Sequence, residues 1–600
     1  MKTIIKKYFS NFLYFYSFLG NKLFLAVLLS IGIGILDGFG LTMFLPLLKL
    51  SDKSQSLGQG DLGLGKLSFI NDWLQSSVIS FNLVSVLVVM VIFFFLKGIV
   101  KYFSGVYRVM LQQSFIKSLR IKMLKSFNKM SFRSFLSSDV GRIQNSMSGE
   151  VDRVARGYNM YFQTFEQLIL VVVYIGFAFV VDFKFATLVT AGGLSTNIIY
   201  NIFYKLTKQA SLRLTLRSNL YQGQIIQHVG NFKYLKATAY LTDYSKKLEA
   251  TISEIEHVRT KIGLYGSVLQ AVREPLLIII VAIVILMQVN FFGGSISSIM
   301  MSLLFFYRAL TALTSMQGNW NKFLETSGSI ENLKKFQQVL NISAEASGKV
   351  PISKFNNVIE LNNVSVIYGS AVVLDNLSLS IKKNDTLAFV GESGSGKTTL
   401  VNVLTGLIIP DKGTMSIDGI DRKEINIQSF QKRLGYVTQE PVIFSDTIYN
   451  NITFWAEPTE DNLKKFRSAI EKSSLVQFID GLPKKELSIL GINGVNISGG
   501  QKQRISIARE LYKEIDILVL DEATSALDTE TERSIQESID NLKGYYTIVV
   551  VAHRLSTVKN ADRIAVMNKG RLLDIGTFEE LVTRNNIFKR MVELQEISLD

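Results

Sequence analysis

Long apolar stretches alternate with basic, polar stretches through the first half of the chain. One of the clearest is residues 78–96, nineteen residues without a charged side chain. A helix needs about 20 mainly apolar residues to cross the hydrocarbon core of a bilayer. The pattern therefore predicts six crossings, at residues 23–50, 78–96, 157–181, 185–204, 262–289 and 295–316. The last two form a hairpin, because Gly293 and Gly294 interrupt an uncharged run that is too long for one helix.

Two long segments between these crossings carry much of the positive charge. Residues 97–156 contain twelve Lys and Arg and residues 205–261 contain ten, whereas residues 51–77 contain two. Because Lys and Arg accumulate in cytoplasmic loops, both segments and both ends of the chain are expected to face the cytoplasm. Both segments also have helical patterning, so the flanking crossings are expected to continue beyond the bilayer as long helices.

Each basic segment has a short polar break near its middle, at residues 137–141 and 227–231. The chain can turn there between two helices and contact a partner domain, or form an ordinary loop tip, and the local sequence leaves both open. Residues 1–20 combine aromatic side chains with lysines, which predicts an elbow helix at the inner membrane surface. The six-helix domain is thus expected at residues 21–325, followed by a linker at 326–356.

The pattern changes from residue 357 to 600, where short apolar strands alternate with helices and predict an α/β domain. Residues 391–398, the phosphate loop, match G-x-x-x-x-G-K-[ST] and lie between a strand pattern and a helix pattern. Glycines let successive backbone N–H groups and the helix N-terminus point at a phosphate chain. Lys397 is expected to contact the β- and γ-phosphates and Thr398 a Mg²⁺ ion, which implies ATP or GTP. The expected phosphate-binding residues are Gly391, Ser393, Gly394, Ser395, Gly396, Lys397, Thr398 and Thr399.

A second chemical signal follows an apolar strand pattern at residues 515–520. The strand ends in Asp521 and Glu522. In a nucleotide-binding fold, an acid at this position orients Mg²⁺, and the acid beside it can accept a proton from the attacking water. The alternative is a solvated strand end without a catalytic role.

Composition narrows the class of protein. The chain is 48% hydrophobic with 40 Phe, and it has no cysteine, which excludes disulfides and thiolate metal sites. The net charge of +15 fits cytoplasmic loops that face anionic lipid. No basic platform interleaved with aromatic residues accompanies this charge, so nucleic acid is not an expected partner.

These motifs together resemble those of the ATP-binding cassette (ABC) transporters. The signature sequence of that family resembles Ser498, Gly499, Gly500 and Gln501. The other matches are Gln439 (Q-loop), Asp528 (D-loop), His553 (switch histidine) and Tyr368 (the aromatic residue that stacks on adenine). The fold implied is an α-helical transmembrane domain of six helices fused to an α/β P-loop nucleotide-binding domain, as in exporters.

The resemblance also implies roles for these residues. Asp521 and Gln439 would complete the Mg²⁺ contacts with Thr398, Glu522 would act as the general base, and His553 would hold the γ-phosphate and the attacking water. One phosphate loop and one signature motif in the chain imply a half-transporter. It would work as a dimer that closes two ATP molecules in its interface, as a homodimer or, alternatively, a heterodimer.

One position departs from the exporter pattern. Exporters of this type usually carry a glutamate just before the signature, whereas Ile492 occupies that place here. The expected role of that charge is coupling to the opposite subunit, so the departure concerns coupling and not ATP chemistry.

Charged residues inside the expected crossings are candidate substrate contacts. The four candidates are Glu166, Arg273, Glu274 and Arg308. Either Arg273 or Arg308 receives an anionic headgroup, or all four extend to the inner interface and pair with one another. The expected function is an ATP-driven exporter or flippase of an amphipathic, phosphate-bearing lipid or glycolipid in a bacterial inner membrane, with the nucleotide-binding domain in the cytoplasm. Multidrug or peptide export is the alternative, and an ATP-gated channel is less favoured.

Overall fold

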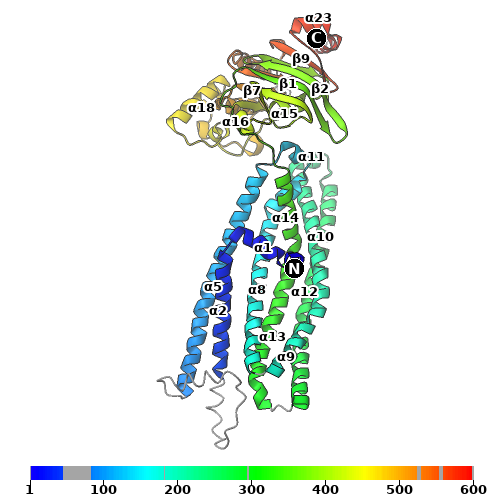
Figure 1. Ribbon diagram of the computed structural model, residues 1–600. Coiled ribbons are helices and arrows are strands. Elements are labelled where there is room, and N and C mark those ends of the chain that lie inside the picture. Colours follow the sequence, from blue (N-terminus) through cyan, green and yellow to red (C-terminus); the bar gives the residue numbers. More distant parts are fainter. Residues whose placement is uncertain are drawn as a thin grey trace, which may run out of the picture. The chain divides into compact units, whose positions relative to one another are not determined.

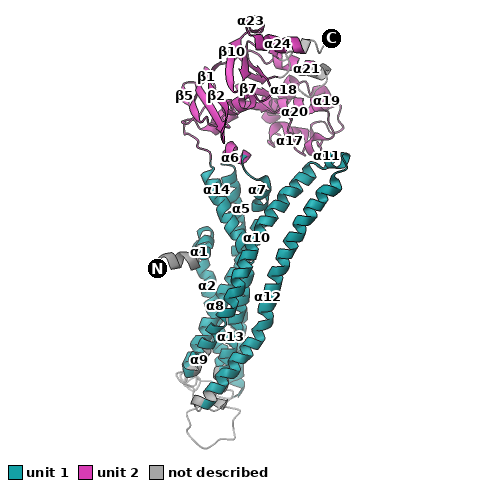
Figure 2. Ribbon diagram, turned by 90° about the vertical axis from the view of Figure 1, so that its right-hand side faces the viewer, with its two compact units in different colours: residues 1–130, 137–344 teal, residues 131–136, 345–600 magenta. Residues whose placement is uncertain are grey.

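The computed structural model describes residues 2–44, 83–181, 183–292, 296–522, 529–552 and 558–596. The chain divides into two compact units (Figure 2). Unit 1 comprises residues 1–130 and 137–344, and unit 2 comprises residues 131–136 and 345–600. The short segment 131–136 therefore belongs to unit 2, although the chain on both sides of it lies in unit 1.

Unit 1 is helical throughout the part that the structure describes (Figure 1). Its two longest helices have 45 and 52 residues, which agrees with the prediction that crossings continue beyond the bilayer as long helices. The helices are α1 (Lys2–Leu19), α2 (Lys22–Thr42), α5 (Leu83–Phe127), α7 (Val140–Met147), α8 (Gly149–Val181), α9 (Phe183–Ser195), α10 (Asn197–Gly230), α11 (Phe232–Ala237), α12 (Leu241–Phe292), α13 (Ile296–Leu324) and α14 (Ser327–Ile342).

Among the described residues, four of the six expected crossings correspond to stretches that are able to span a membrane. By length and composition, α2, α5, residues 140–180 and residues 241–287 are each able to span a membrane. The hairpin of the last two crossings is present, since α12 ends at Phe292 and α13 begins at Ile296. The expected fourth crossing, residues 185–204, consists of two helices, α9 and α10, that meet at Thr196. The Thr196 hydroxyl donates to the Gly193 carbonyl, which competes with the regular helical pattern there.

Both predicted polar breaks coincide with helix ends. The break at 137–141 lies between the end of α6 (Phe132–Leu136) and the start of α7. The Asp139 carboxylate caps α7, because it accepts a hydrogen bond from the Arg142 backbone N–H at 3.0 Å. α10 ends at Gly230 and α11 begins at Phe232 around the other break.

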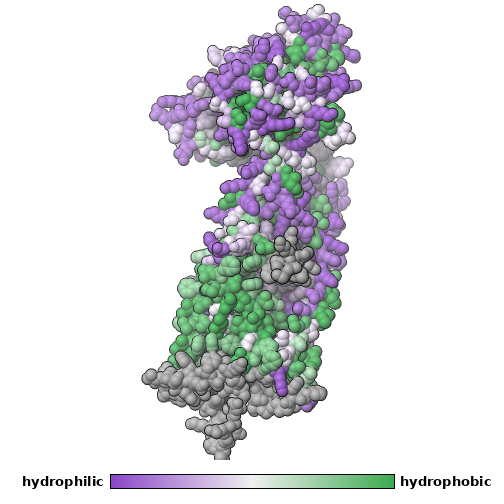
Figure 3. Space-filling view, viewed as in Figure 1, coloured by the Kyte–Doolittle hydropathy of each residue, from purple (hydrophilic) through white to green (hydrophobic). Residues whose placement is uncertain are grey.

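The surface of unit 1 is divided by polarity. In Figure 3 the part nearest the α12–α13 hairpin is largely hydrophobic, and the part nearest α11 is largely hydrophilic. Exposed apolar side chains on α2 and α5, such as Leu28 at 65% and Phe95 at 68%, contribute to the hydrophobic region. Such exposure is costly in water and favourable in a bilayer.

The segment expected as a linker is mostly helix α14. Its apolar residues Leu333, Phe336 and Leu340 are buried in a core that also contains Phe15 of α1 and Phe115 of α5. α14 thus packs as an integral helix of unit 1, and the division between the units falls at residue 344 or 345.

Unit 2 contains two sheets. The first has the strand order β2-β1-β4-β5, with all pairs antiparallel. The second has the order β10-β9-β3-β8-β7-β6, parallel from β9 to β6. The strands are β1 (Val358–Tyr368), β2 (Ala371–Lys382), β3 (Thr386–Gly391), β4 (Lys412–Ile417), β5 (Ile420–Asp421), β6 (Leu434–Val437), β7 (Ile517–Asp521), β8 (Thr547–Val551), β9 (Arg563–Asn568) and β10 (Arg571–Gly576).

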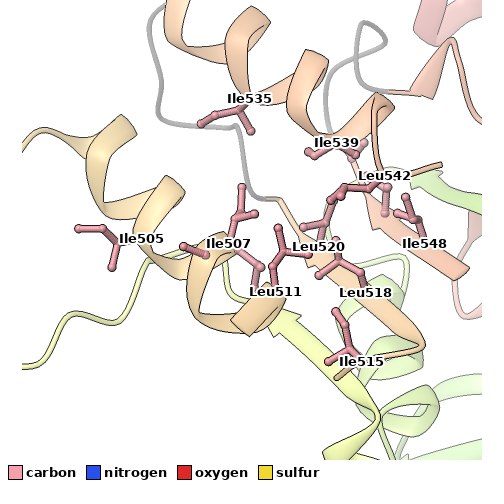
Figure 4. Close-up of a cluster of buried hydrophobic side chains, with 14 of the residues drawn as sticks. Ile505, Ile507, Leu511, Ile515, Leu518, Leu520, Ile535, Ile539, Leu542 and Ile548 are labelled. Carbon is pink, nitrogen blue, oxygen red and sulfur yellow. The ribbon is translucent and has the colours of Figure 1, made fainter. Parts of the chain in front are cut away.

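Helices flank the parallel sheet of unit 2. They are α15 (Lys397–Leu404), α16 (Ile427–Lys432), α17 (Ile448–Thr453), α18 (Glu460–Lys472), α19 (Val476–Asp480), α20 (Gly499–Tyr512), α21 (Thr529–Asp540), α23 (Phe578–Arg584) and α24 (Asn586–Glu596). Figure 4 shows part of the core between them, where Ile507 of α20, Leu518 and Leu520 of β7, and Ile539 of α21 pack together. Burial of this core fixes β7, and with it the acidic residues at its end.

Candidate functional site

The phosphate loop connects β3 with α15, as the sequence predicts. β3 is buried at five consecutive positions in the middle of the parallel sheet, which anchors the start of the loop. Gly394 and Gly396 adopt φ values of 80° and 98°, in the left-handed region that glycine populates without strain. A Cβ atom on Gly396 would lie 2.9 Å from the Val373 carbonyl oxygen, so the loop has no space for a side chain there. The loop therefore wraps closely at the N-terminus of α15, the geometry that suits a phosphate chain.

Two polar groups of the loop are buried. The Lys397 ammonium donates to the carbonyls of Gly391 and Glu392 at 2.8 and 3.1 Å. Burial lowers the pKa of Lys397, and the nearby carboxylates of Glu522 and Asp521 oppose this shift. The Ser395 hydroxyl is buried without a hydrogen-bond partner within the described residues. Phosphate oxygens would satisfy both groups, so the loop fits the β- and γ-phosphates of a nucleotide.

Acidic residues lie at the end of β7. Because β3, β8 and β7 run parallel, their carboxyl ends meet at one edge of the sheet, which brings Asp521 and Glu522 to the edge that carries the phosphate loop. The Asp521 carboxylate accepts from the Tyr436 hydroxyl at 3.1 Å, and the Glu522 carboxylate accepts from the Gln439 side-chain amide at 2.6 Å. The structure thus brings together three of the residues expected around Mg²⁺ and the attacking water.

Glu522 has an unusual backbone conformation. Its φ is 50°, a left-handed value that is costly for a residue with a side chain. The Glu522 backbone N–H donates to the Val551 carbonyl at 3.0 Å, which holds this conformation at the sheet edge. Backbone strain of this kind concentrates at functional sites, where it aims a side chain.

The oxygen donors at this edge suit a magnesium ion. Thr398 is exposed in the first turn of α15, and the amide of Gln439 and the carboxylate of Asp521 offer further oxygen ligands. Magnesium prefers oxygen ligands and keeps several waters in nucleotide sites, so a few protein oxygens are sufficient. The residues present therefore fit Mg²⁺.

A second glycine-rich helix start lies elsewhere on unit 2. Ser498 and Gln501 form a capping box at the N-terminus of α20, with the Gln501 side chain accepting from the Ser498 N–H at 2.9 Å. Gly499 is exposed beside them. α20 packs against α17, α18 and β6, whereas α15 packs against β2, β3 and β7. The exposed start of α20 is thus free to offer its N–H groups to a ligand from outside the domain.

The structure describes two of the four remaining positions that the sequence singled out. Tyr368 is partly buried at the end of β1. Ile492 is 76% exposed. Asp528 and His553 lie outside the described residues, and their expected roles stay predictions.

The four charged residues expected in the crossings have different surroundings. Glu166 forms an ion pair with Arg108 of α5. Glu274 and Arg308 are exposed on α12 and α13. Arg273 donates from Nε to the Thr314 hydroxyl at 2.8 Å and from Nη2 to the Ser315 hydroxyl at 3.3 Å. Of these four residues, only Arg273 lines the cavity described next.

The cavity has a volume of about 790 Å³ and lies within unit 1. Five cationic side chains line it, against one carboxylate, that of Glu325. The cations are Arg153, Arg156, Arg259, Arg273 and Lys322. Burial raises the pKa of Glu325, which disfavours its charged form and leaves the cavity more strongly basic.

Sequence reasoning missed most of this cavity. Arg153, Arg156 and Arg259 belong to the basic segments and served there only to orient the crossings. Their spacing on α8 and α12, at intervals that return to one face of a helix, was the available signal.

The sequence also left Asp37 without a role. The structure buries Asp37 between Lys97 and Tyr174, and both side chains bond to its carboxylate.

Comparisons with known proteins agree with both units. The model of the ABC transporter transmembrane region matches residues 23–316, and the ABC transporter model matches residues 374–525. The chain is 28% identical over 519 residues to an ATP-dependent lipid A-core flippase of Desulfotalea psychrophila, covering 84% of this chain and 89% of that protein. It is 36% identical over 297 residues to an ATP-dependent lipid A-core flippase of Syntrophus aciditrophicus, covering 48% and 49% of the two chains.

Solved structures support the same fold. The structure of a bacterial Atm1-family ABC exporter with ATP bound superposes with a TM-score of 0.78 at 20% identity, over 96% of this chain and 99% of that one. The phosphate loop and the acidic end of β7 lie in the stretch that the ABC transporter model matches. The long membrane helices lie in the stretch that the transmembrane-region model matches. The chain belongs to the ABC transporters, as an exporter-type membrane ATPase that couples ATP hydrolysis to translocation.

Proposed function

We propose that this transporter moves an amphipathic lipid or glycolipid with a phosphate-bearing headgroup from the inner to the outer leaflet of a bacterial inner membrane. The observation that carries the proposal is the basic cavity lined by Arg153, Arg156, Arg259, Arg273 and Lys322. Two relatives, both named ATP-dependent lipid A-core flippase, support a lipid as the transported class.

The charge of the cavity favours an anionic ligand. Within the described residues, neither Arg156 nor Arg273 forms an ion pair with a carboxylate, and the Arg273 guanidinium is held by two hydroxyl groups. Arg156 is exposed, whereas Arg273 is partly buried. A partly buried cation without a counter-ion is costly, and a phosphate oxygen would neutralise Arg273 through charge-assisted hydrogen bonds. A cavity for a cationic or neutral drug would not be expected to concentrate five cations.

The extent of the cavity favours a large headgroup. Arg259 and Arg273 both line it from α12, and fourteen residues of helix rise about 21 Å. Arg273 lies in an expected crossing and Arg259 in the expected cytoplasmic extension. Between them, Ser267, Gln270 and Asn319 offer uncharged hydrogen-bonding groups, which suit sugar hydroxyls. The geometry therefore supports a phosphate near the membrane level and a polar headgroup toward the cytoplasm.

The energy source is proposed to be ATP with Mg²⁺ in two composite sites of a homodimer. Lys397 and Thr398 would hold the phosphates and the ion, and Glu522 would accept the proton of the attacking water. The exposed start of α20, at Ser498 and Gly499, would supply its N–H groups to ATP on the other subunit. This arrangement is supported by the packing of α15 and α20 against different elements.

The test measures ATPase activity of the dimer in nanodiscs with and without phosphorylated lipids. Arg273→Ala is expected to reduce lipid stimulation several-fold while basal ATPase survives, and Arg273→Lys is expected to retain part of the stimulation. Arg308→Ala is the matched control, because Arg308 lies outside the cavity wall. Equal stimulation in wild type and Arg273→Ala, or stimulation by amphipathic drugs alone, would contradict the proposal.

A further inference from the structure

The segment 131–136 inserts an arginine beside the tyrosine that is expected to stack on the nucleobase. This segment contains α6 and belongs to unit 2 (Figure 2). Phe132 packs against the core formed by the antiparallel sheet and the neighbouring strands of unit 2. The Arg133 guanidinium lies 5.4 Å from the centroid of the Tyr368 ring, within the range of a cation–π interaction.

Arg133 also holds the backbone directly before this tyrosine. Its Nη2 donates to the Ile367 carbonyl, and its Nη1 pairs with the Asp411 carboxylate at 2.9 Å. The other oxygen of Asp411 accepts from the Ile367 N–H at 2.7 Å. Arg133 and Asp411 thus bind both backbone polar groups of Ile367, the residue that precedes Tyr368. The hydrogen bonds and charge of Arg133 help to hold the pKa of Asp411 below its usual range, which keeps this carboxylate ionised.

We infer that Arg133 is a positioning residue for the nucleobase subsite. It fixes the end of β1 and the ring of Tyr368 so that the ring is preorganised for stacking on a base. This inference rests on the proposed role of Tyr368. Because Arg133 acts through the ring and not through the phosphates, its removal weakens binding of a nucleotide and leaves binding of a bare polyphosphate unchanged.

The segment 131–136 and a bound nucleobase are expected to stabilise each other through Tyr368. A base that stacks on Tyr368 and the docked segment 131–136 both stabilise the same position of the ring. Base binding therefore strengthens the docking of the segment, and docking strengthens base binding by the same factor. ATP then protects the backbone of residues 131–136 from hydrogen exchange, and tripolyphosphate, which has no base, does not.

The experiment measures dissociation constants of Mg-ATP and Mg-tripolyphosphate for the full-length dimer in the Glu522→Gln background. Arg133→Ala is expected to weaken ATP binding about five-fold and to leave tripolyphosphate binding unchanged. Arg133→Lys is expected to recover part of the affinity for ATP. Leu136→Ala, an exposed position on the same helix, is the matched control and is expected to behave as wild type.

Tyr368→Ala separates the two levels of the argument. If Tyr368→Ala does not discriminate between ATP and tripolyphosphate, the proposed role of Tyr368 is wrong. If Tyr368→Ala discriminates but Arg133→Ala does not, or if Arg133→Ala weakens both ligands equally, the inference about Arg133 alone is overturned. Neither result depends on the lipid substrate, because the assay contains no transported lipid.

Discussion

At the scale of single residues, the ATP site depends on a few side chains that are aimed by their backbone. Glu522 is placed by a strained left-handed φ of 50° directly after a buried strand, and its carboxylate is bound by the Gln439 amide at 2.6 Å. This hydrogen bond holds the carboxylate in one orientation at the edge of the sheet. Lys397 is buried against the carbonyls of its own loop, and in the proposed site it would exchange them for phosphate oxygens.

The first prediction concerns Glu522. Glu522→Gln is expected to reduce ATP hydrolysis by about 10²–10⁴-fold, the usual contribution of a general base, while ATP binding is retained because the phosphate loop is unchanged. Hydrolysis and equilibrium ATP binding are measured on the same purified dimer. Glu440→Gln, an exposed carboxylate beside Gln439, is the control and is expected to hydrolyse ATP normally. Wild-type hydrolysis by Glu522→Gln would rule out this role.

At the scale of elements, close helix packing holds the extensions of the membrane helices together. α7 and α10 approach each other at Gly141 and Gly223. A Cβ atom on Gly141 would lie 2.5 Å from the Gly223 backbone, whereas a Cβ atom on Gly223 would meet nothing nearer than 3.9 Å. Both glycines lie at the contact between α7 and α10, but only Gly141 has no space for a side chain.

This asymmetry gives a matched pair of variants. Gly141→Ala is expected to destabilise the protein by about 1–3 kcal/mol, because backbone atoms cannot move aside as a flexible side chain can. Gly223→Ala is expected to be neutral or stabilising by up to about 1 kcal/mol, since Ala is a better helix former. Thermal unfolding in detergent measures both. Equal effects of the two substitutions would show that the packing of α7 on α10 is not as close as described.

At the scale of the whole molecule, the two glycine-rich helix starts of unit 2 determine how many chains a working site needs. α15 and α20 pack against different elements, and Ser498 and Gly499 are exposed at the start of α20. In the composite sites proposed above, a single chain would supply one half of each of two sites, and two chains would come together when the sites close.

Mixed dimers test this arrangement. Two variants are made, Lys397→Ala and Ser498→Arg, and both also carry Glu522→Gln. A dimer of either variant alone is expected to retain no ATP after gel filtration. A mixture of the two is expected to retain ATP in a fraction of the dimers, because one site then combines an intact phosphate loop with an intact signature. A dimer of Glu522→Gln chains is the positive control. If the mixture retains no ATP, the composite site is excluded.

Much of the nucleotide unit was predictable because its chemistry is local. The phosphate loop, the strand before it and the acids at the end of β7 are each specified by a few consecutive residues. The six crossings and their long extensions follow from apolar runs and charge counts, which also act locally. The junction of α9 and α10 at Thr196 escaped prediction, since its hydroxyl bonds within an otherwise continuous apolar run.

The sequence by itself determined the class of protein, the position of the phosphate loop and the long apolar helices, because each depends on neighbours in the chain. Only the tertiary structure decided which charges meet. Glu166 is paired with Arg108, 58 positions away, and Arg273 shares a cavity with Arg153, Arg156 and Arg259 from α8 and α12. Arg133 reaches Tyr368 across 235 residues of chain. Helix packing sets these distances, and the forces that fix it are non-directional burial and steric fit, which leave no local pattern in the sequence.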